Sequence, residues 1–408
     1  MSALKVVSVS LLGFLLTLSL IIFGLAFTVK MTALNADFVT SRLDALDMPS
    51  LMEEVEYGEL AEDNPELVEL IKDVVIENEA EIKARTGEAI HTVYDYIKGK
   101  DQELGLAQTL RDTVLDPDFI ISIVEDADLS SLTRELLVEI TSEAELPYGL
   151  SVEPHLDDIT LELEPWLKEQ AGIAIPAVCD YVLGQNQSID IVISLDPVKE
   201  SLEDRLKQDL LSSPPPELGG LSKAELEQVF DTLFEEYSQD IGLALEIDEE
   251  SIGSEVPADV ADSLVEAETA LEDSREYIGH FTLGYNLLIV FILLLTAGIV
   301  LIHREVKGST RTLAGIFITF GVVNLVAVLV ARALIRPPLE QIEDIPSSLL
   351  EWIVQTANSS LTPLLVMAIV LLVVGAALLA FSIIYSRRQA RMAAGHPYSS
   401  TQEDEPSP

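Results

Sequence analysis

The chain contains a single cysteine, Cys179, and only 24 basic side chains against 69 acidic ones in 408 residues. One cysteine excludes an intramolecular disulfide and a cysteine-based zinc site. The shortage of lysine and arginine excludes nucleic-acid binding, because phosphate contacts need clustered basic side chains. The sequence also lacks a phosphate-binding glycine loop, a G-x-S-x-G elbow and an HExxH motif, so no catalytic residue, metal ligand or cofactor is predicted. These absences favour a non-enzymatic protein without excluding an enzyme.

Apolar residues and acidic residues are both abundant, which is unusual for one soluble domain. Hydrophobic residues make up 49% of the chain and its mean hydropathy is +0.33, yet its formal net charge is -45. The two groups are separated along the sequence. Residues 31–280 hold 61 acidic and 14 basic side chains, whereas the rest of the chain holds 8 and 10. The composition therefore predicts membrane spans joined to an acidic folded region.

Four apolar runs are long enough to cross a bilayer, whose hydrocarbon layer is about 30 Å thick. The predicted spans are residues 6–29, 285–302, 313–335 and 363–385. The first is longer than the apolar core of a signal peptide, which has about 7–15 residues, so an uncleaved anchor is expected. The third contains Arg332 near one end, where its side chain can reach the interface. We expect an all-α membrane protein with four transmembrane helices.

Basic residues beside the spans predict the orientation, because they favour the cytoplasmic side. Seven flank one side and three flank the other: Lys5, Arg304, Lys307, Arg311, Arg387, Arg388 and Arg391 against Lys30, Arg332 and Arg336. The predicted cytoplasmic parts are residues 1–5, the connection 303–312 and a disordered tail at 386–408. Residues 30–284 and the loop 336–362 are then outside, on a multi-pass protein of the cell membrane.

The predicted extracytoplasmic domain, residues 30–284, contains an internal repeat. NADFVTSRLDALDMPSLMEE at 35–54 aligns without gaps to DPDFIISIVEDADLSSLTRE at 116–135, with seven of twenty positions identical. KARTGEAIHTVYDYIKGKDQ at 83–102 aligns to KEQAGIAIPAVCDYVLGQNQ at 168–187, with nine of twenty identical. We interpret the pattern as a tandem duplication, with repeat A at about 35–115 and repeat B at about 116–200.

Helix signals recur through both repeats. In repeat A, a helix is expected from Pro65 to Gly99, with Asn64 as its cap. In repeat B, Pro165 and Pro176 predict that the matching helix is broken or kinked. After each helix a short alternating segment follows, at 103–106 and 188–195. These segments can form two paired strands or remain extended connectors.

A helical stalk region is predicted at 221–284. Ser222 and Glu225 form a capping box at the start of one helix. From Pro257 the apolar spacing predicts a helix that continues into the second span, and residues 31–46 are expected to prolong the first span similarly. Residues 346–357 have the pattern of a short interfacial helix, with Trp352 at headgroup level.

The repeated DY-x-x-G motif is the most specific candidate site. It comprises Asp95, Tyr96 and Gly99 in repeat A, and Asp180, Tyr181 and Gly184 in repeat B. The six residues can form a two-fold ligand site. The alternative, which we favour, is structural: the tyrosines pack between repeats and the glycines end helices. Charge density alone also allows weak cation binding by the domain.

Two functions are compatible with this organisation. The first is a membrane-anchored protein whose acidic outer domain binds a partner at the cell surface, such as an envelope protein or a polymer. The second is a permease-like or transmitting subunit that contacts a cytoplasmic protein through Arg304, Lys307 and Arg311. The order of one early span, a large outer domain and three later spans resembles that of permeases of mechanotransmitting ABC transporters. The resemblance is one of topology only. An outward-facing hydrolase ranks third.

The unique thiol tests the orientation. We expect a membrane-impermeant maleimide to reach Cys179 in intact cells, because residues 30–284 are predicted to lie outside. Labelling only after the inner membrane is permeabilised would reverse the predicted topology.

Overall fold

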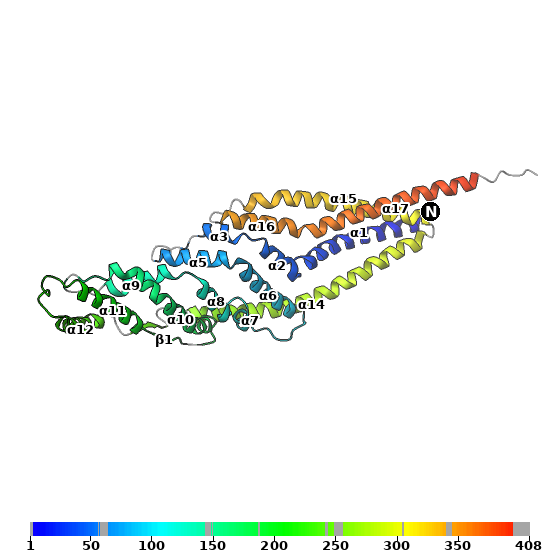
Figure 1. Ribbon diagram of the computed structural model, residues 1–408. Coiled ribbons are helices and arrows are strands. Elements are labelled where there is room, and N and C mark those ends of the chain that lie inside the picture. Colours follow the sequence, from blue (N-terminus) through cyan, green and yellow to red (C-terminus); the bar gives the residue numbers. More distant parts are fainter. Residues whose placement is uncertain are drawn as a thin grey trace, which may run out of the picture. The chain divides into compact units, whose positions relative to one another are not determined.

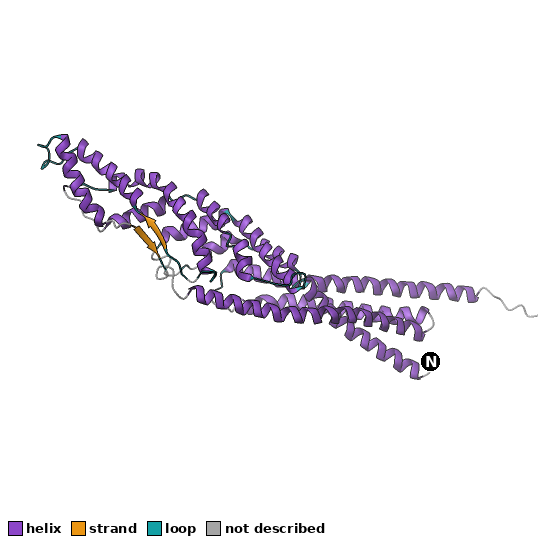
Figure 2. Ribbon diagram, turned by 90° about the horizontal axis from the view of Figure 1, so that it is seen from below, coloured by secondary structure: helices purple, strands orange, loops and turns teal. Residues whose placement is uncertain are grey.

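The computed structural model describes residues 3–55, 57, 64–142, 148, 150–186, 188–240, 244–248, 256–303, 306–339 and 345–394. These residues are mostly helical, with one pair of short strands (Figures 1 and 2). The chain divides into two compact units. The first combines Met1–Leu46 with Arg275–Pro408, and the second is Asp47–Ser274. Each unit has its own apolar core.

The first unit is a set of membrane helices with two shorter helices. Its elements are α1 (Ala3–Met31), α2 (Ala36–Asp44), the later part of α14 (Val256–His303), α15 (Val306–Leu339), α16 (Ser347–Ser360) and α17 (Thr362–Ala394). Among the described residues, four helical segments are long and apolar enough to cross a membrane, as the sequence predicts: Val7–Met31, Ala258–His303, Gly308–Leu339 and Ser347–Arg388. The protein is therefore an α-helical multi-pass membrane protein.

Leucine and phenylalanine side chains from the membrane helices share one core. Its buried residues are Leu16, Leu20, Leu295, Ile299, Leu313 and Phe320, and Met367, Leu371 and Leu378 of α17 pack against them. The core therefore joins α1, α14, α15 and α17 within the first unit.

The helices α15 and α17 pack closely because glycines stand at their contacts. A Cβ on Gly321 would lie 2.8 Å from the carbonyl oxygen of Ala368, and one on Gly375 would lie 3.0 Å from the backbone nitrogen of Ile318. Since Gly321 opposes Ala368 whereas Gly375 opposes Ile318, the two helices are antiparallel. Small residues let backbones approach where no water drives helices together. Gly321 of α15 and Gly375 of α17 therefore permit two close contacts along the same helix pair.

The second unit consists of short and medium helices with two strands. In chain order its elements are α3 (Met48–Glu54), α5 (Pro65–Glu77), α6 (Glu79–Ile97), α7 (Leu106–Asp112), α8 (Pro117–Asp126), α9 (Ser130–Ser142), the 3-10 turn η2 (Glu153–His155), α10 (Leu156–Val182), β1 (Ile191–Ser194), α11 (Asp196–Ser212), α12 (Lys223–Asp240), β2 (Ala244–Ile247) and the first part of α14.

Two apolar clusters hold the second unit together. In the larger one, Val198, Leu202, Leu206 and Leu210 form a stripe along α11, at a spacing of four residues. This stripe packs with α10 and α12, including Phe230, whose side chain is 2% exposed. The smaller cluster contains Tyr181 of α10 and the inward side chains of β1.

Of the two alternatives for residues 188–195, a paired strand forms at Ile191–Ser194, but its partner is not the segment 103–106. β1 pairs antiparallel with β2, and Ile191 faces Ile247 in the register. Ile191 and Ile193 are buried whereas Val192 is exposed, as the alternation predicts. The segment 103–106 forms no strand, because Leu106 begins α7, where its N–H donates to Glu268 Oε1 at 2.6 Å.

The long helix of repeat B is continuous, whereas the helix predicted from Pro65 in repeat A is divided into two. α10 is one helix of 27 residues that contains Pro165 and Pro176, so the helix is not broken there, and the predicted alternative, a kink, stays a prediction. Its ends are held by different apolar clusters, which offset the backbone hydrogen bonds that prolines remove. In repeat A, α5 and α6 are separated at Asn78, whose side-chain amide donates to the carbonyl of Val74 at 2.9 Å. Asparagine competes with helical hydrogen bonding in this way.

Several predicted segments are helical over different bounds. α14 is continuous for 48 residues, in agreement with the expected continuation from Pro257 into the second span. The first span is not prolonged, because α1 ends at Met31 and α2 begins separately at Ala36. Most of the 303–312 connection lies in α15, and the predicted tail is helical as far as Ala394. The rest of that tail lies outside the described residues.

The predicted interfacial helix is α16, and only Leu361 separates it from α17. Its Trp352 indole N–H donates to the carbonyl of Arg42 at 2.6 Å, and Arg42 Nη1 donates to Ser359 Oγ at 3.1 Å. Trp352 is thus held by protein contacts within the first unit. Its placement at headgroup level stays a prediction.

Burial makes Cys179 a poor labelling site. Its side chain is 7% exposed, and burial raises the pKa of the thiol, which lowers the fraction of reactive thiolate. The orientation is therefore better tested with Ser213→Cys, an exposed position, in a Cys179→Ala background. We expect impermeant maleimide to label Ser213→Cys in intact cells, and to label Ser386→Cys only after permeabilisation.

The larger cluster is tested by Leu206→Ala, which removes a side chain that is 1% exposed. Such a cavity costs about 2–5 kcal/mol of unfolding free energy. Trp166, which packs against this cluster, reports its unfolding by fluorescence in a Trp352→Phe background. The control, Val192→Ala, removes an exposed side chain and should shift the transition little. Equal shifts in the two variants would contradict the assignment of the core.

Candidate functional site

Both copies of the DY-x-x-G motif end a helix with the same backbone geometry. Gly99 and Gly184 have φ angles of 75° and 67°, in the left-handed region that favours glycine. After α6, the N–H of Gly99 donates to the carbonyl of Tyr96 and the N–H of Lys100 donates to the carbonyl of Asp95, both at 2.9 Å. These paired bonds define a Schellman motif, which satisfies the last carbonyls of a helix.

The same two bonds recur after α10. The N–H of Gly184 donates to the carbonyl of Tyr181 at 2.9 Å, and the N–H of Gln185 donates to the carbonyl of Asp180 at 2.8 Å. The spacing from aspartate to glycine is therefore the spacing that this helix end requires. The requirement of this helix end is enough to explain why the motif recurs.

The two aspartate side chains have different partners. Asp95 accepts from Nζ of Lys100 at 2.6 Å, on an exposed surface, and this hydrogen bond lowers the pKa of the Asp95 carboxyl. Asp180 accepts from Nε of Arg111 in α7 at 2.6 Å, and that bond raises the pKa of Arg111. Since Arg111 belongs to predicted repeat A and Asp180 to repeat B, the second pair connects the two segments.

The tyrosines of the motif are packing residues. Tyr181 is 1% exposed and belongs to the smaller cluster with Ala174 and Ile189. Tyr96 is also buried, at the end of α6. Neither ring offers an open face to a ligand.

The described contacts do not join the two motifs into one site. No hydrogen bond or ion pair connects Asp95 with Asp180 in the part of the chain that the structure describes. Nor do three or more histidine, cysteine, aspartate or glutamate side chains converge on a possible metal position there. The arrangement supports helix termination and an inter-helix ion pair.

The basic connection proposed for cytoplasmic contact is described only in part. Arg304 lies outside the described residues. Lys307 is in the first turn of α15, and Arg311 is exposed one turn further along the same helix. These positions place two of the three residues at one end of α15.

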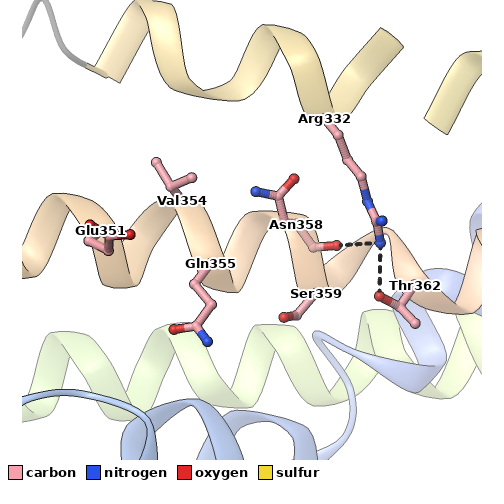
Figure 3. Close-up of a pocket in the computed structure, with 7 residues that line it drawn as sticks. All are labelled: Arg332, Glu351, Val354, Gln355, Asn358, Ser359 and Thr362. Carbon is pink, nitrogen blue, oxygen red and sulfur yellow. Dashed lines mark hydrogen bonds between the residues drawn. The ribbon is translucent and has the colours of Figure 1, made fainter. Parts of the chain in front are cut away.

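A polar pocket in the first unit is the candidate that the sequence motifs miss. It has a volume of about 450 Å³ and lies between α15, α16 and the start of α17 (Figure 3). The lining residues are Arg332, Glu351, Val354, Gln355, Asn358, Ser359 and Thr362. The only sequence signal for it is a charged residue within a span, which often marks function.

Arg332 lies at one end of the pocket, and Glu351 lies at the other (Figure 3). Nη2 of Arg332 donates to the carbonyl of Asn358 at 3.3 Å and to Thr362 Oγ1 at 3.2 Å. Nε of the same side chain is buried and has no hydrogen-bond partner among the described residues. Arg332 therefore holds the end of α16 and keeps donor capacity for a further group.

Comparisons with known proteins add no family. No family model matches the chain, and neither a curated protein nor a solved structure matches it. The class that the fold defines is an α-helical multi-pass membrane protein, and its function must be argued from its own residues.

The helix-ending role of the motif is tested by Gly184→Ala. A Cβ in the left-handed conformation costs roughly 1–2 kcal/mol, so the unfolding transition reported by Trp166 should move to lower denaturant. The matched control is Gly172→Ala inside α10, the helix that Gly184 follows, where an added Cβ meets nothing within 4 Å. There alanine should be neutral or stabilise by up to about 1 kcal/mol. Similar losses in both variants would contradict this role.

Proposed function

We propose that the protein is a non-enzymatic membrane anchor that presents an acidic helical unit to a partner at the cell surface. The observation that carries the proposal is the surplus of carboxylates in a folded unit. Residues 31–280 have a formal charge of -47, from 14 basic and 61 acidic side chains. Such a field attracts cationic partners and repels anionic surfaces.

The basic residues of the second unit are largely committed to pairs within it. Lys83, Lys168 and Lys207, for example, pair with Glu79, Glu164 and Asp231 at 2.6–3.0 Å. Even one carboxylate for every basic residue would leave 47 of the 61 carboxylates of residues 31–280 without a cation. The uncompensated charge is therefore available to an external partner, which is a basic protein surface, a basic polymer or weakly bound cations.

The predicted duplication agrees with this role. The aligned blocks both contain two short helices, α2 with α3 and α8 with α9, and both long helices end in a Schellman motif. Asp47 and Asp128, which align, each accept from a backbone N–H at the start of the following helix. Repeats A and B would then offer two related surfaces of the same charge. The placement of this unit outside the cell rests on the distribution of basic residues beside the spans.

The continuity of α14 favours the second candidate function, a permease-like or mechanotransmitting subunit. One helix of 48 residues passes from the acidic unit into the membrane unit. In that case a cytoplasmic ATPase would co-purify with the protein, and changes at Arg304, Lys307 and Arg311 would abolish the association.

Crosslinking in intact cells tests the two functions together. We expect the recovered partner to be crosslinked to residues 47–274. Asp259, Asp262 and Glu266 are exposed on α14 and have no ion pair in the described structure. The variant Asp259→Asn/Asp262→Asn/Glu266→Gln should therefore reduce crosslinking several-fold at physiological salt, where charges act over about 8 Å.

The control variant removes three carboxylates that already have a cation: Glu79→Gln, Glu164→Gln and Asp231→Asn. Its net charge equals that of the first variant, so a smaller loss identifies the unpaired carboxylates as the cause. Crosslinks confined to a cytoplasmic ATPase would replace the proposal by the second function.

A further inference from the structure

The pocket at Arg332 has more hydrogen-bond donors than the described protein uses. A guanidinium carries five N–H donors in a planar fork, and the two bonds to Asn358 and Thr362 both come from Nη2. Nε is buried and has no partner in the described part of the chain, which costs free energy unless a ligand accepts its hydrogen. Within the described residues no carboxylate forms an ion pair with Arg332. The surplus donors fit an oxyanion.

The surroundings of Arg332 strengthen this preference. Thr362 is the first residue of α17, a helix of 33 residues, so the positive end of the helix dipole lies beside the guanidinium. Ser359 adds a hydroxyl to the same end of the pocket. Arginine, hydroxyl groups and a helix N-terminus are groups that bind phosphate.

The rest of the pocket fits a larger polar group than phosphate alone. Gln355 lines its middle, and Glu351 lies at the far end, two turns of α16 from Asn358 (Figure 3). Two helical turns correspond to about 11 Å. The volume of about 450 Å³ also exceeds the need of a single anion. Amide and carboxylate oxygens accept hydrogen bonds, so they suit a hydroxyl or ammonium group attached to the phosphate.

Apolar surface adjoins the polar pocket on both membrane helices. Leu329 is exposed on α15 about one turn before Arg332, and Val366 and Val370 are exposed on α17 after Thr362. In a membrane span this surface faces acyl chains. A ligand with a phosphate and hydrocarbon chains therefore matches both parts of the site.

We propose that the Arg332 pocket binds the headgroup of a membrane phospholipid, with the phosphate on Arg332 and the hydroxyl or ammonium end directed toward Gln355 and Glu351. This site is separate from the acidic unit and does not depend on its partner. It gives the membrane unit a specific lipid at the junction of α15, α16 and α17.

The test uses the full chain with Trp166→Phe, so that Trp352 on α16 is the only tryptophan. Purified protein in detergent is heated after addition of phosphatidylethanolamine, phosphatidylglycerol, diacylglycerol or inorganic phosphate. We expect both phospholipids to raise the unfolding temperature that Trp352 fluorescence reports. Diacylglycerol should leave this temperature unchanged. Arg332→Gln should weaken phospholipid binding about tenfold, since it removes a charged donor.

Arg336→Gln is the matched control, because Arg336 is one turn from Arg332 on α15 and does not line the pocket. It should keep the response to phospholipid. An equal loss in Arg332→Gln and Arg336→Gln would show a general effect of charge and overturn the site. A response to inorganic phosphate at the same concentrations would identify a soluble phosphate as the ligand and overturn the lipid assignment.

If Arg332→Gln fails to fold, the variant Glu351→Gln still tests whether the headgroup binds in the proposed direction. Removing this carboxylate should increase affinity for phosphatidylglycerol relative to phosphatidylethanolamine, because a negative charge is lost beside the headgroup. Unchanged relative affinity would contradict the proposed direction of the headgroup, and the absence of a shift with either phospholipid would overturn the site.

Discussion

A backbone within hydrocarbon must satisfy its own hydrogen bonds, and this requirement determines how the chain is divided. The apolar segments form complete helices, and 58 of the 69 acidic residues lie in a second unit with its own core. Within the first unit, α15 and α17 meet at Gly321 and Gly375, because dispersion contacts replace the hydrophobic effect between helices in lipid. Where charge does enter a span, at Arg332, hydrogen bonds to α16 and α17 hold it.

In the acidic unit, scarce basic residues have large structural roles. Arg111 connects α7 to the end of α10, and Arg85 pairs with Asp116 at 2.8 Å before α8. Helix ends are completed by carboxylates as well: Glu225 accepts from Ser222 and so has a lowered pKa, as in the predicted capping box. This cap is retained at neutral pH and lost as the pH falls through the pKa of folded Glu225. A small set of contacts therefore orders a unit whose charges mainly repel one another.

Local signals in the sequence predict the spans, the continuity of α14 and the ends at Gly99 and Gly184, because these depend on residues close in sequence. Tertiary contacts decide the rest. Two apolar clusters hold α10 as one continuous helix through Pro165 and Pro176, and β2 is assigned by its pairing with Ile191 across more than fifty residues. The Arg332 pocket was missed for the same reason, since it requires α16 to dock beside α15.

The shared core of the membrane helices also has a consequence for biosynthesis. Leu16 and Leu20 pack with Leu295 and Phe320, whose codons are translated far later. At about 5–20 residues per second, ribosomes need on the order of 15–60 s for the intervening chain. During that time α1 must remain in the bilayer without its final neighbours, exposed to insertion factors and quality-control proteases. Assembly of the core is therefore a late step, which is completed only when the last helices have left the ribosome.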